Sequence, residues 1–239
     1  MVKMMIGKKT NNAQDQGGFM NTRRQILNKN SSFVVQEAYK TLRTNVRFFL
    51  QGHGCKKLCI TSSAAGEGKS ITLLNLAISF AEAGDKVLLI DADLRRPAVA
   101  RLLVEKATPG LSNVLAGLCT AQEAIRSDIY PNLDILFSGE IPPNPSELLG
   151  NEQMVNMIDN LADRYDYILV DTPPVNVVSD ACIVSNLVDG ILLLVRKDST
   201  KKDGVKRAVE KLRFTGSKPI GFVFNGVEVD DNSSYTYHN

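Results

Sequence analysis

A glycine-rich stretch, residues 62–70, offers the most specific chemistry in this chain. It reads Ser-Ser-Ala-Ala-Gly-Glu-Gly-Lys-Ser, follows an apolar strand expected at 57–61 and precedes a helix expected at 71–83. This order turns backbone N–H groups and a helix N-terminus toward one point, where an anionic phosphate binds well. Lys69 would reach the β- and γ-phosphates of a nucleoside triphosphate, and the Ser70 hydroxyl would hold Mg²⁺. The stretch therefore predicts a phosphate-binding loop.

Three aspartates stand at or just beyond the ends of two further expected strands: Asp91, Asp93 and Asp171. The carboxyl ends of parallel strands present the ligand site of such a sheet. Asp91 and Asp93 are two residues apart, so their side chains leave on the same face. One acid of such a pair can organise a metal ion while the other accepts a proton from an attacking hydroxyl. For any single aspartate, the alternative is a cap on the following helix.

The predicted site has a catalytic part, a metal-binding part and a nucleotide-binding part. We expect Lys69, Asp91 and Asp93 to be catalytic, with Asp91 as the proton acceptor. We expect Mg²⁺ to be held by Ser70, Asp93 and Asp171. The expected nucleotide contacts are Ala65, Gly66, Glu67, Gly68, Lys69, Ser70, Ile71, Asp171 and Asn225. For Asn225, an adenine contact and an ordinary strand end are equally good interpretations.

The loop departs from the full phosphate-loop pattern at one position. That pattern has glycine where Ser63 stands. A small residue there is also compatible with a tight turn that has no function. Because three separate strand-end signals occur in the right order, we favour the nucleotide-binding interpretation.

Composition and charge exclude several functional classes. The chain has 239 residues and a net charge of +2, so no strong global field indicates a nucleic-acid partner. Residues 1–30 carry six cationic side chains against one aspartate, a net +5, which leaves −3 for the remainder. A basic leader could contact an anionic membrane surface, but a solvated tail explains the same charges, and we favour it.

Four cysteines and two histidines give no zinc-like pattern. No Cys-x-x-Cys pair occurs, and nothing suggests a disulfide framework, which fits a reducing cytosol. No apolar run approaches about 18 residues, so we expect no membrane span. The beginning of the chain lacks the apolar core of a secretory signal. We expect a cytoplasmic protein that reaches a membrane only through a partner or its basic leader.

Strands and helices alternate along most of the chain, which predicts a single doubly wound α/β domain with a mostly parallel sheet. Several strands are apolar throughout, as strands buried on both faces are. The expected strands are 57–61, 86–91, 132–138, 167–171, 190–195 and 219–225. The expected helices are 33–51, 71–83, 97–106, 121–127, 151–164, 179–186 and 203–214. We divide the chain into a flexible leader (1–32), the domain (33–229) and a disordered tail (230–239).

The helix expected at 33–51 is amphipathic. Its apolar face comprises Val35, Ala38, Leu42, Val46 and Phe49. Its polar face comprises Glu37, Lys40, Arg43 and Arg47. A polar stripe of this kind is either a solvated surface or a contact with another subunit.

The motifs together resemble those of the bacterial tyrosine kinases (BY-kinases) of capsule and exopolysaccharide synthesis. The resemblance covers residues 33–229. It rests on the loop at 62–70, the acidic motif at 88–97 and the Ile-Leu-Val-Asp-Thr-Pro-Pro motif at 168–174. A fourth segment, Ser-Gly-Glu-Ile-Pro-Pro-Asn-Pro-Ser-Glu-Leu-Leu at 138–149, is a family hallmark that generic phosphate-loop proteins lack.

The resemblance implies an ATP- and Mg²⁺-dependent tyrosine autokinase that regulates capsular or exopolysaccharide synthesis and export. It implies a ring of eight identical subunits, joined through a Glu-x-x-Arg-x-x-Arg motif that here reads Glu37, Lys40 and Arg43. It implies transfer in trans to tail tyrosines, here Tyr235 and Tyr237. It further implies a membrane adaptor that holds the kinase at the inner face of the cell membrane, and a cognate phosphotyrosine phosphatase.

Two other functions remain open at this stage. ParA- or MinD-like ATPases share the fold, but they carry an extra lysine early in the phosphate loop, where this chain has Ala64. The chain could also be a nucleotide-gated regulatory partner of a membrane polysaccharide machine. A phosphotyrosine assay with ATP and Mg²⁺ separates this last function from a kinase.

Overall fold

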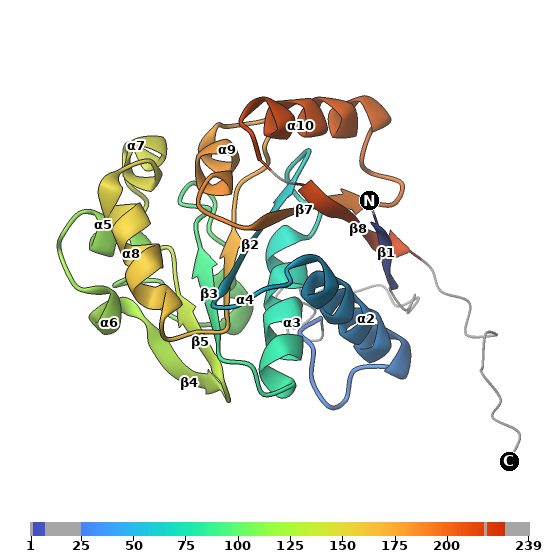
Figure 1. Ribbon diagram of the computed structural model, residues 1–239, viewed down its shortest axis with the longest axis horizontal. Helices are drawn as coiled ribbons and strands as arrows, with labels where there is room; N and C mark the ends of the chain where they lie inside the picture. Colours follow the sequence, from blue (N-terminus) through green and yellow to red (C-terminus); the bar gives the residue numbers. More distant parts are fainter. Residues whose placement is uncertain (1, 8–24, 218, 228–239) are drawn as a thin grey trace, which may run out of the picture.

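Eight strands in the described part of the chain form one sheet (Figure 1). The computed structural model describes residues 2–7, 25–217 and 219–227. The strands are β1 Val2–Gly7, β2 Lys56–Ser62, β3 Val87–Asp91, β4 Arg126–Tyr130, β5 Leu133–Leu136, β6 Tyr167–Asp171, β7 Gly190–Arg196 and β8 Pro219–Val227. Their spatial order is β1-β8-β7-β2-β6-β3-β5-β4. All neighbours are parallel except β4, which pairs antiparallel with β5.

Helices cover both faces of this sheet. They are α2 Phe33–Phe49, α3 Lys69–Glu82, α4 Val99–Leu103, α5 Leu111–Leu115, α6 Ala121–Ala124, α7 Pro145–Leu149, α8 Glu152–Ala162, α9 Asp180–Ser185 and α10 Lys202–Phe214. Buried side chains of α2, α3 and α4 belong to one core cluster, and those of α5 to α10 belong to a second. No helix among the described residues is long and apolar enough to cross a bilayer.

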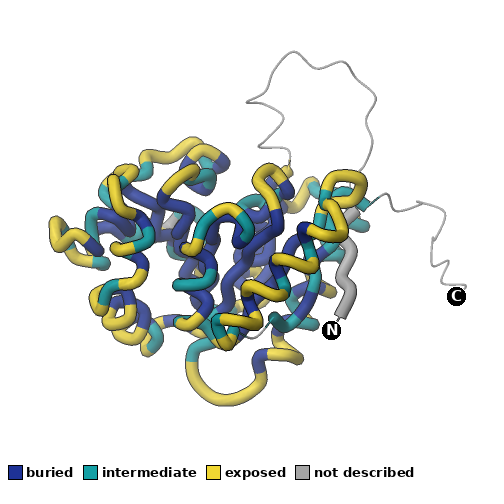
Figure 2. Tube along the Cα trace, turned by 90° about the horizontal axis from the view of Figure 1, so that it is seen from above, coloured by how far each residue is buried: buried dark blue, intermediate teal, exposed yellow. Residues whose placement is uncertain are grey.

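The central strands alternate between the two cores, as their two-residue period requires. In β3, Leu89 packs into the first cluster, whereas Leu88 and Ile90 pack into the second. In Figure 2 the central strands are buried while the outward faces of the helices are exposed. The continuous apolar runs in the sequence are therefore explained by burial on both faces.

The doubly wound α/β fold predicted from the sequence is confirmed. The differences lie in short elements. The helix expected at 121–127 ends at Ala124, and Arg126–Tyr130 forms the antiparallel strand β4 instead. The helix expected at 97–106 is only α4, because Val104 adopts a left-handed conformation (φ 61°) that ends it. The short helices α5 and α7 were not predicted.

The leader also differs from expectation. Residues 2–7 form β1, which pairs in parallel with β8 at the edge of the sheet. Ile26 and Leu27 are buried, and the Leu27 N–H donates to Asn75 Oδ1 at 2.8 Å. The expectation of a wholly flexible leader is therefore wrong for these residues, because β8 and α3 offer them partners that are distant in sequence. The domain boundaries stay a prediction, and the tail at 230–239 lies outside the described residues.

Helix α2 packs through Tyr39, Leu42 and Val46, whereas Phe49, expected on the apolar face, is 37% exposed. The residues of its predicted polar stripe do not all lie at the surface. Arg43 does not project into solvent: its guanidinium donates to the Ser79 carbonyl of α3 and to Ser79 Oγ.

The rest of the stripe lies at the surface. Glu37 and Lys40 form an exposed ion pair at 2.8 Å. Arg47 pairs with Asp85 and lies over the ring of Phe80. Arg43 therefore secures α2 to α3, so its expected place on a purely polar face is corrected: it is part of the packing between these two helices.

Candidate functional site

The glycine-rich loop joins β2 to the first turn of α3. Gly66 (φ 77°) and Gly68 (φ 100°) both adopt left-handed conformations that side-chain-bearing residues rarely take. A Cβ atom on Gly68 would also collide with the amide of Asn225. The two glycines are therefore required by backbone geometry, and they bring the start of α3 directly to Lys69.

Glu67 supports this loop from inside. Its side chain is 1% exposed. Its carboxylate accepts hydrogen bonds from the Ser63 N–H (3.2 Å), the Ser63 hydroxyl (3.0 Å) and the Thr200 hydroxyl (2.7 Å). The serine that departs from the usual glycine thus has a specific role, because its hydroxyl helps to hold Glu67. Glu67 faces the body of the protein rather than the ligand side of the loop.

Two further side chains hold the loop from the neighbouring strands. Asn225 on β8 donates from Nδ2 to the Glu67 carbonyl at 2.9 Å. Arg196 at the end of β7 donates to the Gly66 carbonyl at 2.8 Å. Asn225 therefore supports the loop in this structure, and its expected contact with adenine stays a prediction. Arg196 and Thr200 were missed because nothing local in the sequence marks residues that bond a loop more than 100 positions away.

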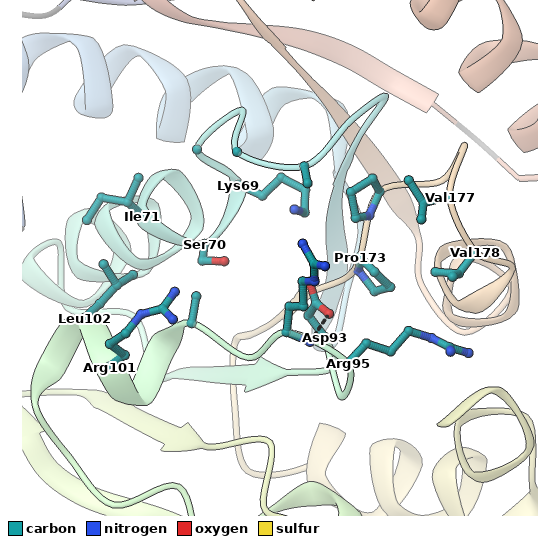
Figure 3. A pocket seen from close by; sticks show the side chains of 16 residues that line it. Lys69, Ser70, Ile71, Asp93, Arg95, Arg101, Leu102, Pro173, Val177 and Val178 are labelled. Atoms are coloured by element: carbon teal, nitrogen blue, oxygen red, sulfur yellow. Dashed lines mark hydrogen bonds between the residues drawn. The ribbon is translucent and has the colours of Figure 1, made fainter. Parts of the chain in front are cut away.

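A cavity of about 510 Å³ lies on the ligand side of the loop (Figure 3). Figure 3 shows the side chains of Lys69 and Ser70 directed into it, with Asp93 on the opposite side. Its lining comprises Ala65, Gly66, Gly68, Lys69, Ser70, Ile71, Asp93, Arg95, Arg96, Ala98, Arg101, Leu102, Pro173, Pro174, Val177 and Val178. The structure thus brings together most of the predicted nucleotide contacts. It adds three arginines, whose charge suits a polyphosphate.

Asp171 lies beneath this cavity at the end of β6 and is completely buried. Neither of its carboxylate oxygens has a well-formed hydrogen bond, although the Ser70 hydroxyl and the Thr172 N–H lie near enough to lower its pKa. Burial raises its pKa, while the nearby Lys69 ammonium and Ser70 hydroxyl oppose the rise. An ionised carboxylate buried in this way is costly unless a cation compensates it. The orphaned oxygens, with the Ser70 hydroxyl and Asp93 close by, therefore fit a hard divalent ion such as Mg²⁺.

Asp91 and Asp93 occupy different environments. Asp91 is fully buried and pairs in register with Asp171 across β3 and β6. Its Oδ2 accepts from the N–H groups of Ala98 (3.2 Å) and Val99 (3.1 Å), so it caps the start of α4. Burial, followed by the negative charge of Asp171, raises its pKa.

Asp93 instead lines the cavity, with Oδ1 accepting from the Arg96 N–H at 3.0 Å. The helix cap that we weighed against catalysis is therefore present at Asp91. Of the two acids, Asp93 is the one that reaches the ligand side.

Comparison with known proteins agrees with the nucleotide-binding character of the site. A family model described as an AAA domain matches residues 55–216. The tyrosine-protein kinase YwqD of Bacillus subtilis (strain 168) is 41% identical over 202 residues, which are 84% of this chain and 85% of that protein. The putative tyrosine-protein kinase CapB of Staphylococcus aureus is 35% identical over 205 residues, which are 86% and 90%.

Solved structures show the same relationship. The chimerical protein CapA2B2 superposes with a TM-score of 0.84 at 33% identity, covering 95% of this chain and 94% of that one. The kinase domain of the Escherichia coli tyrosine kinase ETK gives 0.83 at 29% identity, covering 99% and 94%. The septum site-determining protein MinD of Pyrococcus horikoshii, complexed with Mg-ADP, gives 0.62 at 25% identity over 72% and 70%.

The MinD-like alternative therefore shares the phosphate-loop fold but matches less of the chain, and less closely, than the kinases do. With a loop of the nucleotide-binding type, a buried carboxylate beside it and relatives of this similarity, this chain belongs to the bacterial tyrosine-protein kinases of capsule and exopolysaccharide synthesis.

Proposed function

We propose that the chain binds ATP with Mg²⁺ in the cavity described above and transfers the γ-phosphoryl group to tyrosine. The orphaned carboxylate of Asp171, beside Lys69 and Ser70, is the observation that carries this proposal. Ser70, Asp93 and Asp171 would hold the metal, which would neutralise charge on the phosphates. The loop N–H groups and Lys69 would bind the β- and γ-phosphates.

The proton of the attacking tyrosine hydroxyl would pass to one of the two acids at or just beyond the end of β3, Asp91 or Asp93. Asp93 has the position for this role, because it lines the cavity. Asp91, our candidate from the sequence, lies behind it and bonds the backbone of α4. Asp91→Asn separates the two assignments, since an asparagine oxygen can still accept from α4. Near-complete loss of transfer in Asp91→Asn, with nucleotide binding retained, assigns the proton to Asp91. Substantial activity in Asp91→Asn, together with a loss in Asp93→Asn that excess Mg²⁺ does not restore, assigns it to Asp93.

The acceptors in this proposal are Tyr235 and Tyr237 of a neighbouring subunit. Asn225 is fixed to the phosphate loop, and the ten residues from there to Tyr235 span at most about 35 Å when extended. Asp230 and Asp231 would bring negative charge toward a cavity that carries three arginines and Lys69. A phosphate would add nearly two negative charges to each tyrosine, which would repel the tail from the site acids and release the contact.

For assembly, we propose a ring whose interface includes the exposed Glu37–Lys40 pair on α2. Phe33 and Phe48 of the same helix are 75% and 70% exposed, which supports a contact surface there. One of the solved relatives is a chimera of two proteins, CapA2B2. We propose a corresponding membrane adaptor, so that the kinase would act at the inner face of the membrane, opposed by a phosphotyrosine phosphatase.

Mixing two variants tests transfer in trans. A Lys69→Ala chain serves as the acceptor, and a chain lacking residues 230–239 serves as the donor, with ATP and Mg²⁺. Phosphate on Tyr235 or Tyr237 of the acceptor supports the proposal. Label confined to Tyr39, Tyr130, Tyr165 or Tyr167 rejects the tail as the substrate. ATP-dependent assembly without any phosphotyrosine would favour a nucleotide-gated regulatory partner instead.

A further inference from the structure

A buried aspartate outside the predicted site organises part of the cavity. Asp180 begins α9 and its side chain is 0% exposed. Its carboxylate accepts two hydrogen bonds from Arg95, from Nε at 2.8 Å and from Nη2 at 3.2 Å. The Ser146 hydroxyl donates to the same carboxylate at 2.6 Å and accepts from Arg95 Nη2 at 2.8 Å. Each of the three side chains is therefore bonded to the other two.

This triad joins two walls of the cavity. Arg95 lies two residues after Asp93, in the irregular segment between β3 and α4. Asp180 closely follows the other wall, whose lining includes Pro173 and Val178. The segment that carries Asp93 is thus held on its inner side by Asp91 and on its outer side by Asp180.

The third member comes from the segment at 138–149, one of the motifs on which the resemblance to the bacterial tyrosine kinases rests, which does not line the cavity. Asn144 precedes α7 and Pro145 occupies its first turn, so the proline fixes where the helix begins. Ser146 is the next residue. The proline-rich entry to α7 therefore places one hydroxyl against Arg95 and Asp180.

We propose that Asp180 and Ser146 are positioning residues that hold Arg95, and through it the segment bearing Asp93, in the geometry needed for phosphoryl transfer. This inference rests on the proposed function of Asp93. Phosphoryl transfer depends mainly on positioning and charge placement. A displacement of about 1 Å can reduce such a rate about 100-fold.

The bidentate geometry makes this contact specific. A guanidinium matches a carboxylate in two parallel bonds, whereas a lysine ammonium makes a point contact. Since Asp180 is completely buried, losing Arg95 would leave its charge uncompensated. Arg95 itself is 38% exposed on its side chain, so a small solute can reach the space that it leaves on truncation.

The test measures transfer to an added tyrosine peptide, with kcat and the KM for ATP determined separately. We expect Asp180→Asn to lower kcat by about 10-fold or more while the KM for ATP changes less than about 3-fold. Ser146→Ala should give a smaller loss, and Ser146→Thr should restore it. Arg95→Lys should fall between wild type and Arg95→Ala, and methylguanidine should partly restore Arg95→Ala.

Asp159→Asn is the matched control, because it removes an acid from an exposed ion pair with Lys57 at 3.1 Å, away from the cavity lining. It should leave both constants unchanged. Thermal unfolding identifies any variant that is merely unfolded, and the Ser146 pair keeps the inference testable in that case. Unchanged kcat in folded Asp180→Asn, or no difference between Ser146→Ala and Ser146→Thr, overturns the positioning role.

Failure of the proposed function gives a different pattern. Wild-type protein would then bind ATP yet transfer no phosphate to any tyrosine. In that case the positioning role of the triad is tested by a binding assay instead. The assay measures the Mg²⁺ concentration that each protein needs to bind a fluorescent ADP analogue. A requirement in Asp180→Asn at least about 3-fold higher than in wild type would support positioning of Asp93 for the metal, and an unchanged requirement would refute it.

Discussion

Replacing Asp171 with asparagine should stabilise the nucleotide-free protein and weaken its response to nucleotide. The native carboxylate is fully buried, and its oxygens have no well-formed hydrogen bond. The charge of Lys69 stabilises this carboxylate, whereas the neighbouring acids Asp91 and Asp93 repel it. Removing one negative charge therefore relieves both desolvation and repulsion.

The size of the effect follows from the burial. Leaving a buried polar group unsatisfied costs about 1–3 kcal/mol, and more when the group is charged. An asparagine amide is still buried there, so we expect a net gain of about 1–3 kcal/mol in the free energy of unfolding. For a chain of this size, that corresponds to a rise of about 2–12 °C in Tm.

The assay is thermal unfolding in EDTA and again with saturating Mg-ADP. A ligand present at 100 times its Kd stabilises the native state by about 2.7 kcal/mol. Wild type should gain this stabilisation and Asp171→Asn should gain much less. With Mg-ADP, the difference between the two Tm values should therefore become smaller than in EDTA or change sign. A variant that is less stable than wild type in EDTA would refute the reasoning.

The pH dependence provides a second check on Asp171. The raised pKa means that the native state binds more protons than the unfolded chain above the ordinary range of aspartate. In EDTA, wild-type stability is then greatest at or below that range and declines as the pH rises through the raised native pKa. Asp171→Asn should show a shallower decline. An equal slope in both proteins would assign the ionisation elsewhere.

Three other predictions follow from the site and from α2. Lys69→Ala should abolish nucleotide binding with the fold retained, as calorimetry and circular dichroism would show; normal binding would contradict the assignment of the loop. Asn225→Ala removes one hydrogen bond to the loop, about 1 kcal/mol, and should weaken binding of an ADP analogue about 5-fold. Arg43→Ala should destabilise by about 1.5–3 kcal/mol, because it removes charged hydrogen bonds to Ser79, whereas Lys40→Ala should change stability by less than about 0.5 kcal/mol. Equal denaturation midpoints for these two α2 variants would argue against Arg43 as a structural anchor.

The sequence was sufficient for features whose causes are local. A run such as Leu88-Leu89-Ile90, with residues that are disfavoured in strands on either side, is typical of a strand buried on both faces, and the left-handed turns at Gly66 and Gly68 favour glycine. These two signals located the central strands and the phosphate loop, and with them Lys69 and Ser70.

Features that depend on distant partners could not be predicted in this way. β1 is a strand because β8, more than 200 residues later, offers it an edge. The inward direction of Arg43 depends on the carbonyl of Ser79, since helical periodicity alone placed it on the polar face. Asp180 looks like an ordinary first-turn acid until Arg95 is brought against it.

The anchoring of Asn225 has a consequence for the proposed transfer to the tail tyrosines. Asn225 lies two residues before β8 ends at Val227, and its amide is bonded to the loop that would cradle the phosphates. The end of β8 is therefore held at a fixed position relative to the phosphate loop, and so to a nucleotide bound there. In the proposed ring, each subunit would offer its proposed acceptor tyrosines from the same radius around its own nucleotide. The effective concentration of acceptor at the next site would then be set by tether length and ring geometry, and not by the amount of protein in the cell.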